Sequence, residues 1–146
     1  MNASTYALSC DCGALTLTAH GEPAASEYCH CATCRAFHGV DMTSVTAWPE
    51  AQVELPAVDA NAVFEYAHPH KQMRRFGCAR CGTLLYARHR PGMPVIEHAR
   101  FRVANDGELP RALMPARHLF YAERVIDIDD ELPKYRTDAQ SEIIGA

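Results

Sequence analysis

Seven cysteines, gathered in three clusters, are the residues of this sequence whose types and spacing point most directly to chemistry. The clusters are "CDC" (10–12), "CHCATC" (29–34) and "CARC" (78–81). Clustered cysteines in an intracellular chain are more often metal ligands than disulfides, and an odd count excludes a complete disulfide framework. The pattern therefore favours metal sites with thiolate ligands, for which zinc is the usual ion.

Two of the clusters have a glycine directly after their last cysteine, in "CDCG" (10–13) and "CARCG" (78–82). A zinc knuckle bends the backbone so that N–H groups point at sulfur, and the residue after the second cysteine then often adopts a conformation that suits glycine. We expect the two pairs to form one closed structural zinc site with the ligands Cys10, Cys12, Cys78 and Cys81. The alternative is scattered buried thiols or a redox CxxC, but "CARC" lacks the βαβ context of a redox motif.

The middle cluster has Arg35 in place of the glycine and leaves a group of three cysteines, Cys29, Cys31 and Cys34, called the trio below. Three thiolates are one ligand short of a tetrahedron. Zinc sites with three protein ligands and one exchangeable position are typically catalytic. The trio therefore predicts a second, catalytic zinc that is open to a reactant.

A histidine from elsewhere in the chain would close the trio and make its site structural. His30 lies between two of the cysteines and is expected to point to the opposite side if Cys29 and Cys31 share a face. The histidines that remain eligible by residue type are His38, His68, His70 and His89.

The segments between the clusters alternate apolar and polar residues with period two, which is typical of half-buried strands. Strands are predicted at 14–20, 42–48, 62–67, 82–88 and 94–103, with one or two more in 118–128. A short helix or turn is expected at 34–39, and no longer segment has a helical period with caps. The sequence predicts a mostly β protein with its metal clusters in loops.

The composition fits one globular domain. The chain has 146 residues, 48% of them hydrophobic and 22% charged, with a formal net charge of -4, and we expect a single zinc-binding β domain over 1–136 and a loose tail over 137–146. The charge provides no basic face for nucleic acid. The start of the chain has no signal-peptide pattern, and no apolar run approaches the ~20 residues of a membrane span. A cytoplasmic protein without nucleic-acid or membrane partners is therefore predicted.

Three ordered motifs stand at "SCDCGALTLTAHG" (9–21), "YCHCATCRAFHG" (28–39) and "RRFGCARCGTLLY" (74–86). Together they resemble the family of glutathione-dependent formaldehyde-activating enzymes, also known by its centromere-protein-V-type domain. The later "MPARHLFYAERV" with "DDELPKY" (114–135) resembles the usual ending of the family. The resemblance covers roughly residues 5–136. It implies two packed β-sheets in a β-tent, a structural zinc on the four cysteines named above and a catalytic zinc on the trio.

The activity that the resemblance implies is that of a carbon–sulfur lyase, which joins glutathione and formaldehyde into S-hydroxymethylglutathione. The sequence departs from the family pattern where Gly77 stands between Phe76 and Cys78, and where 40–72 carries no familiar motif. The expected partners are a small-molecule thiol and an aldehyde. The alternative is a non-enzymatic, zinc-stabilised β domain that binds a protein partner.

Within the enzymatic interpretation, some polar residues have two possible roles. His30 or His38 is a candidate proton donor to the nascent hydroxyl, or an ordinary polar residue. The arginines Arg35, Arg74 and Arg75 are candidates to hold the carboxylates of an anionic thiol, or loop charges and donors to thiolates.

Overall fold

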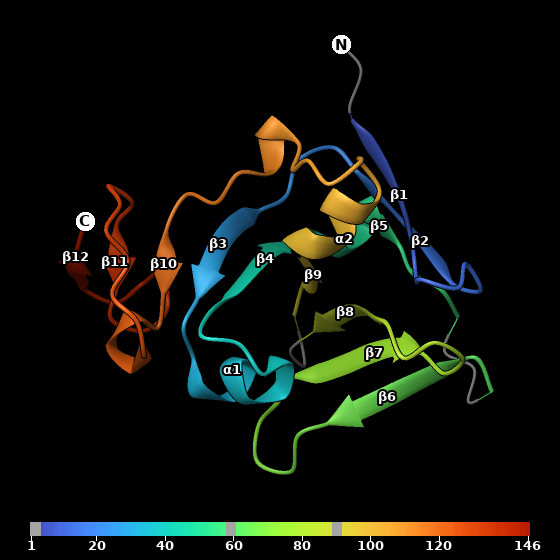
Figure 1. Cartoon of the computed structure of the whole chain (residues 1–146), viewed down its shortest axis with the longest axis horizontal. Coiled ribbons are helices and arrows are strands. Elements are labelled where there is room, and N and C mark those ends of the chain that lie inside the picture. Colours follow the sequence, from blue (N-terminus) through green and yellow to red (C-terminus); the bar gives the residue numbers. More distant parts are fainter. Residues whose placement is uncertain (1–3, 58–60, 89–91) are drawn as a thin grey trace. The chain divides into compact units, whose positions relative to one another are not determined.

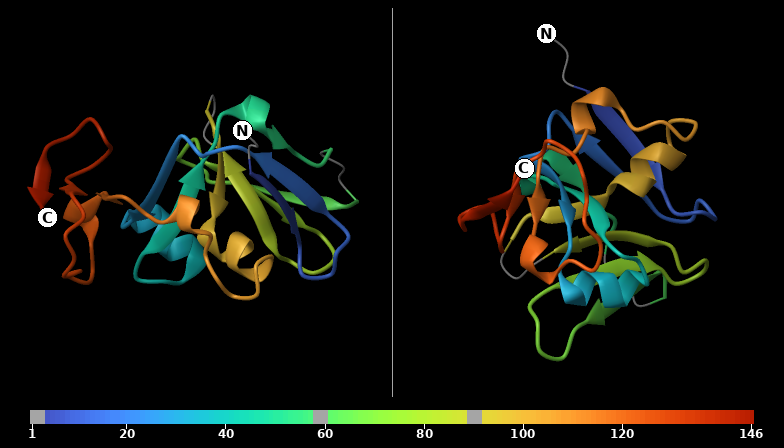
Figure 2. Two further views of the ribbon diagram at one scale, coloured as in Figure 1. Left: turned by 90° about the horizontal axis from the view of Figure 1, so that it is seen from above. Right: turned by 60° about the vertical axis from the view of Figure 1, so that its left-hand side comes forward.

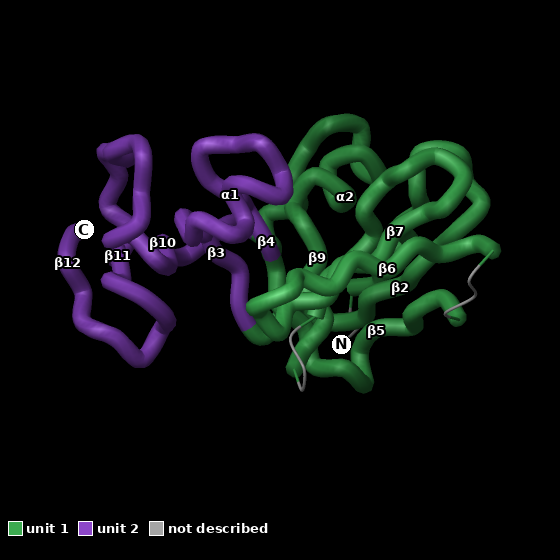
Figure 3. Tube along the Cα trace, turned by 90° about the horizontal axis from the view of Figure 1, so that it is seen from below, with its two compact units in different colours: residues 1–24, 46–113 green, residues 25–45, 114–146 purple. Residues whose placement is uncertain are grey.

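The computed structural model describes residues 4–57, 61–88 and 92–146. Its chain divides into two compact units, coloured separately in Figure 3: residues 1–24 with 46–113, and residues 25–45 with 114–146. The prediction of a mostly β fold with two sheets and few helices is confirmed. No helix in the described part of the chain is both long enough and apolar enough to cross a membrane.

The first unit contains a three-stranded sheet, a series of four neighbouring strands and a short helix (Figures 1 and 2). The three-stranded sheet has the order β1-β2-β5, and the other strands are neighbours in the order β9-β8-β7-β6. The elements are β1 (Thr5–Ser9), β2 (Thr16–His20), β5 (Val53–Glu54), β6 (Val63–Ala67), β7 (Arg74–Cys78), β8 (Leu84–Arg88), β9 (Pro94–Glu97) and α2 (His98–Val103), with short 3-10 turns η1 (Glu50–Gln52) and η2 (Arg111–Leu113).

The hydrophobic core cluster found among the described residues lies in this first unit. Period-two alternation places Leu17 and Ala19 of β2 inside, where Leu17 is paired with Leu8 of β1. Trp48 is fully buried and stacks on Phe101 of α2 with ring centroids 6.0 Å apart. Cys10 and Cys78 are members of the same buried cluster. Two of the predicted ligands are therefore fixed by core packing.

The second unit contains strands that are neighbours in the order β12-β11-β10-β3-β4 and one helix. Its elements are β3 (Ala25–Cys29), α1 (Ala32–His38), β4 (Thr43–Ala47, whose last two residues belong to the first unit), β10 (His118–Leu119), η3 (Tyr121–Glu123), β11 (Lys134–Tyr135) and β12 (Ile143–Gly145). The predicted tail, 137–146, thus contains a strand that pairs with β11. The buried polar side chains of this unit include His30, His118 and Lys134.

Two strand predictions need correction. Residues 94–103 form β9 and then the helix α2, because burial changes from period two at Ile96 and His98 to a three-residue step from His98 to Phe101. In 118–128 only the two residues of β10 are strand. Phe120 has a φ of 54°, which turns the chain into η3 after that pair.

Gly77 is explained by close packing across the strands. It faces Phe64 in the register of β6 and β7, and a Cβ at this position would lie 2.4 Å from the Phe64 ring and 2.5 Å from the Thr83 carbonyl oxygen. The departure from the family pattern at Gly77 therefore makes room for Phe64.

We expect Gly77→Ala to destabilise the protein by about 1–3 kcal/mol, because the added methyl group overpacks a site bounded partly by backbone. Urea unfolding monitored by circular dichroism measures the change. Gly145→Ala is the control with less crowding, since the nearest atoms there are Lys134 side-chain carbons at 3.2 Å and beyond. Equal stability of Gly77→Ala and the wild type would show that the Phe64 ring moves aside without strain.

Candidate metal centres

The four-cysteine group is assembled by two turns of the first unit. Cys10 and Cys12 follow β1, Cys78 ends β7 and Cys81 lies in the turn before β8. Their sulfur atoms all lie within 4.8 Å of one another, with Cys10 and Cys12 Sγ 3.6 Å apart and Cys12 and Cys78 Sγ 3.7 Å apart. Zn–S bonds of 2.3 Å place the sulfurs of a tetrahedron about 3.8 Å apart. The spacing therefore fits a tetrahedral zinc.

The backbone at this group has the knuckle conformation that the glycines predict. Gly13 and Gly82 have φ values of 80° and 79°, a region that glycine adopts without steric cost. The N–H of Leu15 donates to Cys10 Sγ at 3.3 Å, and the N–H of Arg80 donates to Cys78 Sγ at 3.4 Å. N–H donors directed at sulfur stabilise thiolates.

Thr83 prepares a further sulfur for metal binding. Its hydroxyl lies 3.1 Å from Cys81 Sγ, and this hydrogen bond is the main reason that the pKa of Cys81 falls to about 5. The Thr83 hydroxyl also accepts a hydrogen bond from the Asp11 N–H at 3.1 Å. Thr83 thus connects the two knuckles, a role that the sequence analysis missed and that the "CGT" order alone could have suggested.

The trio is assembled where β3 ends and α1 begins, within the second unit. The sulfurs of Cys29, Cys31 and Cys34 lie within 4.8 Å of one another, and each residue is half-buried. Cys31 is the N-cap of α1, and its Sγ accepts a hydrogen bond from the Cys34 N–H at 3.3 Å. The helix ends at Gly39, whose φ is 66° and whose N–H donates to the Arg35 carbonyl. The predicted helix at 34–39 thus lies at 32–38.

The donor set of the trio fits a cation. Hydrogen bonding to Cys31 and Cys34, burial and the charges of those two thiolates all raise the pKa of Cys29. Three sulfurs in this arrangement cannot all ionise without a positive charge between them. In the described part of the second unit, no histidine or carboxylate side chain joins the three sulfurs.

The histidines considered as a fourth ligand have different positions. The His30 ring is fully buried and lies 2.9 Å from His118, outside the sulfur group. His38 is in the last turn of α1. His68 and His70 lie between β6 and β7 in the first unit, with ring centroids 6.2 Å apart. His89 lies outside the described residues.

The trio loop is held by contacts of Arg35 and Ala32 with Glu123. The Arg35 side chain donates to the His30 carbonyl at 3.0 Å and to the Glu123 carbonyl at 2.9 Å. The Glu123 carboxylate accepts the N–H of Ala32, at the start of α1, at 2.9 Å. Arg35 thus helps to fix the conformation of the trio loop. Glu123 does so as well, and the charged stretch in which it lies gave no sign of this role in the sequence.

The other arginines considered for substrate binding are also engaged or buried. Arg74 pairs with Glu65 on the neighbouring strand, and Arg75 is 1% exposed. Both lie in β7, and the structure gives neither of them an assigned ligand-binding role.

Comparison with known proteins identifies a family and similar solved structures. The family model of glutathione-dependent formaldehyde-activating enzymes matches residues 5–123. A crystal structure of a Rhodobacter sphaeroides protein is similar at 18% sequence identity, covering 71% of this chain and 97% of that chain, with a TM-score of 0.48. No curated protein matches significantly. The match of the family model extends from β1 through η3 and includes all seven cysteines, and the chain belongs to the family of glutathione-dependent formaldehyde-activating enzymes.

Proposed function

We propose that this protein is a zinc-dependent carbon–sulfur lyase-type enzyme that works on thiol adducts of small aldehydes at the trio. The observation that carries the proposal is the contrast between the two sulfur groups. Four cysteines complete one tetrahedral ligand set, while three half-buried cysteines make up the other. Membership of the family supports glutathione and formaldehyde as the reactants.

The reaction would join the thiol sulfur to the aldehyde carbon. The S–C bond forms as the carbonyl π bond breaks, and the proton of the thiol ends on the new hydroxyl oxygen. A zinc ion bound by the trio would supply a Lewis acid that lowers the pKa of the incoming thiol. The chain itself holds the three sulfurs in place through the N-cap of α1 and the contacts between Arg35 and Glu123.

The structure narrows the choice of proton donor. Burial, together with the neighbouring His118, Arg124 and Arg35, lowers the pKa of His30 to about 4. His30 is therefore neutral near pH 7 and has no proton to spare for a nascent alkoxide. His38, in α1 close to the trio in sequence, is the better candidate for this role.

A reducing compartment such as the cytoplasm suits this chemistry. All seven cysteines are thiols in this structure, and both sulfur groups need reduced cysteines to bind metal. We infer a cytoplasmic location on this ground.

The test compares glutathione with S-methylglutathione, which keeps the charges of the peptide but has no thiol. With cobalt replacing zinc, we expect glutathione to change the visible spectrum of one of two metal ions per chain, and S-methylglutathione to leave it unchanged. Exchange NMR then measures the interconversion of formaldehyde and S-hydroxymethylglutathione, which we expect to be at least about 10-fold faster with the protein, since positioned acid–base catalysis alone gives factors of this size or more.

The spontaneous reaction at equal buffer, thiol and aldehyde concentrations is the control. If neither peptide changes the spectrum of either metal ion, and the exchange rate is unchanged by the protein, the enzymatic function is rejected and the zinc-stabilised protein-binding domain is favoured.

A further inference from the structure

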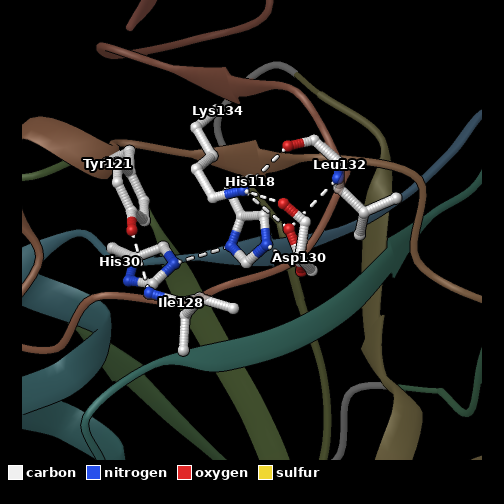
Figure 4. Close-up of polar contacts among 7 residues, drawn as sticks. All are labelled: His30, His118, Tyr121, Ile128, Asp130, Leu132 and Lys134. Atoms are coloured by element: carbon white, nitrogen blue, oxygen red, sulfur yellow. Dashed lines mark hydrogen bonds and ion pairs between the residues drawn. The ribbon is translucent and has the colours of Figure 1, made fainter. Parts of the chain in front are cut away.

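Four polar side chains, three of them buried and Asp130 partly exposed, form a continuous hydrogen-bonded array in the second unit, drawn in Figure 4. The His30 ring Nε2 lies 2.9 Å from His118 Nδ1, and His118 Nε2 lies 2.8 Å from Asp130 Oδ2. Lys134 Nζ lies 2.6 Å from the other carboxylate oxygen of Asp130. His30 and His118 are both fully buried, and Lys134 is 3% exposed. The proposed reaction does not use His118, Asp130 or Lys134.

The donor and acceptor in each hydrogen bond of the array can be assigned by starting from the Asp130 carboxylate. Lys134 and the Leu132 N–H both donate to Asp130 Oδ1. Burial raises the pKa of Asp130, but these donors and His118 outweigh it and hold the pKa at about 2. An ionised carboxylate only accepts, so His118 Nε2 must carry a hydrogen. A His118 ring with its one hydrogen on Nε2 accepts at Nδ1, and His30 then donates from its own Nε2–H.

This leaves His30 Nδ1 with a lone pair. That atom is buried and has no hydrogen-bond partner among the described residues. The opposite direction of the His30–His118 bond would put an N–H there, and orphaned buried N–H groups are rarer than under-used acceptors. The unpartnered Nδ1 therefore supports the same tautomer as the Asp130 end does.

Aromatic rings keep the two imidazoles in place. Tyr28 stacks on His118 with centroids 4.9 Å apart, and Tyr121 meets the His30 ring edge-on at 5.0 Å. The Tyr121 hydroxyl is itself held, because it accepts the Ile128 N–H at 2.9 Å. Rotation of either imidazole would break these ring contacts as well as the hydrogen bonds.

The array reaches the trio through the backbone of His30. This residue separates Cys29 from Cys31, its N–H donates to the Leu119 carbonyl at 3.0 Å, and its carbonyl accepts from Arg35. Fixing the ring and both backbone groups of the middle residue fixes the placement of the cysteines on either side. Groups that orient metal ligands typically change metal affinity 10- to 100-fold when they are mutated.

We propose that His118, Asp130 and Lys134 are positioning residues for the trio: they hold His30 as its Nε2–H tautomer and so set the geometry with which Cys29 and Cys31 bind metal. The inference rests on the proposed function in one respect, namely that the trio binds a metal ion.

The decisive variant is Asp130→Asn in the full chain. Lys134 requires an acceptor, so the amide oxygen faces Lys134 and the amide NH₂ faces His118 Nε2, which must then be the acceptor. His118 changes to the Nδ1–H tautomer and donates to His30 Nε2, so that His30 becomes Nδ1–H as well. Ring ¹⁵N NMR of the reduced, zinc-loaded protein measures both tautomers. We expect Nε2–H for both rings in the wild type and Nδ1–H for both rings in the variant.

Metal affinity gives the second readout, by competition with a chromophoric zinc chelator. We expect Asp130→Asn to weaken zinc binding at the trio about 10-fold and to leave the four-cysteine group unchanged as an internal control. Asp129→Asn is the matched control, because it removes the same charge from the neighbouring exposed residue. It should alter neither the ring spectra nor either affinity.

The inference is overturned by a wild-type His30 that carries its hydrogen on Nδ1, a measurement that requires no variant to fold. It is also overturned if the tautomers invert while the affinity of the trio stays the same, or if both metal sites weaken equally. Failure of the wild-type trio to bind zinc at all would instead reject the proposed function, and the positioning role with it.

Discussion

Replacing Cys78 by serine is expected to remove zinc from the four-cysteine group and to unfold the first unit. Cys78 Sγ is a predicted ligand, and the residue is fully buried among the side chains of the hydrophobic core. Structural zinc contributes about 10–16 kcal/mol to the folding of small zinc domains. This is of the same size as the roughly 5–15 kcal/mol by which whole domains are stable. The free energy of folding that is lost with the ion is therefore expected to exceed the stability that the hydrophobic core supplies alone.

The measurements are zinc content by atomic emission and thermal unfolding followed by circular dichroism. Cys78→Ala separates loss of the ligand from burial of a serine hydroxyl, and Cys81→Ser removes a ligand at the exposed rim of the group. All three variants should lose one zinc per chain, and Cys78→Ser should be the least stable. A Cys78→Ala protein with the zinc content and melting temperature of the wild type would show that the group is no structural metal site.

The composition of the four-cysteine group could be predicted from sequence because its signal is local. The glycine after Cys12 and the glycine after Cys81 adopt positive φ to form the knuckles, and Arg35 after Cys34 marks a different geometry. The strands at 16–20, 43–47, 63–67 and 84–88 could be predicted for the same reason, since alternation reports which face of a strand is buried.

The surroundings of the trio could not be predicted in this way. His30 and His118 are 88 residues apart in sequence, and only the parallel pairing of β3 with β10 brings them together. Asp130 and Lys134 lie in "DDELPKY", which has the composition of an exposed charged loop. Charge patterns along a chain give no information on partners that a distant strand supplies, so a buried ion pair and a surface pair look alike in sequence.

The shortness of the strand within 118–128 has a related cause. The apolar and aromatic residues of "HLFYAERVIDI" favour a strand, but Phe120 turns the chain so that Tyr121 contacts His30 and Glu123 caps α1. Tertiary contacts with the trio loop outweigh local β propensity here, in agreement with the strong dependence of that propensity on context. Gly77 could likewise be noticed as a departure, but the Phe64 ring that explains it lies on another strand.

Replacing Cys34 by serine is expected to have the opposite outcome to replacing Cys78. Cys34 is half-buried in the first turn of α1 and lies outside the hydrophobic core cluster. The variant should keep its fold, bind one zinc per chain where the wild type binds two, and lose the thiol-dependent acceleration of formaldehyde exchange down to the spontaneous rate. A serine hydroxyl does not replace a thiolate as a zinc ligand at neutral pH, because its proton is not lost there.

The prediction is tested by measuring zinc content, melting temperature and the formaldehyde exchange rate by NMR on the same preparations. Thr33→Ser is the matched control, since it changes the neighbouring residue of the same helical turn and removes no sulfur. Global unfolding of Cys34→Ser, at a temperature where Thr33→Ser stays folded, would mean that the trio holds a second structural ion. A variant that keeps full exchange activity with one zinc per chain would place the chemistry away from the trio. Only the combination of a kept fold, one lost ion and lost acceleration agrees with a site where the fourth ligand is the substrate thiol.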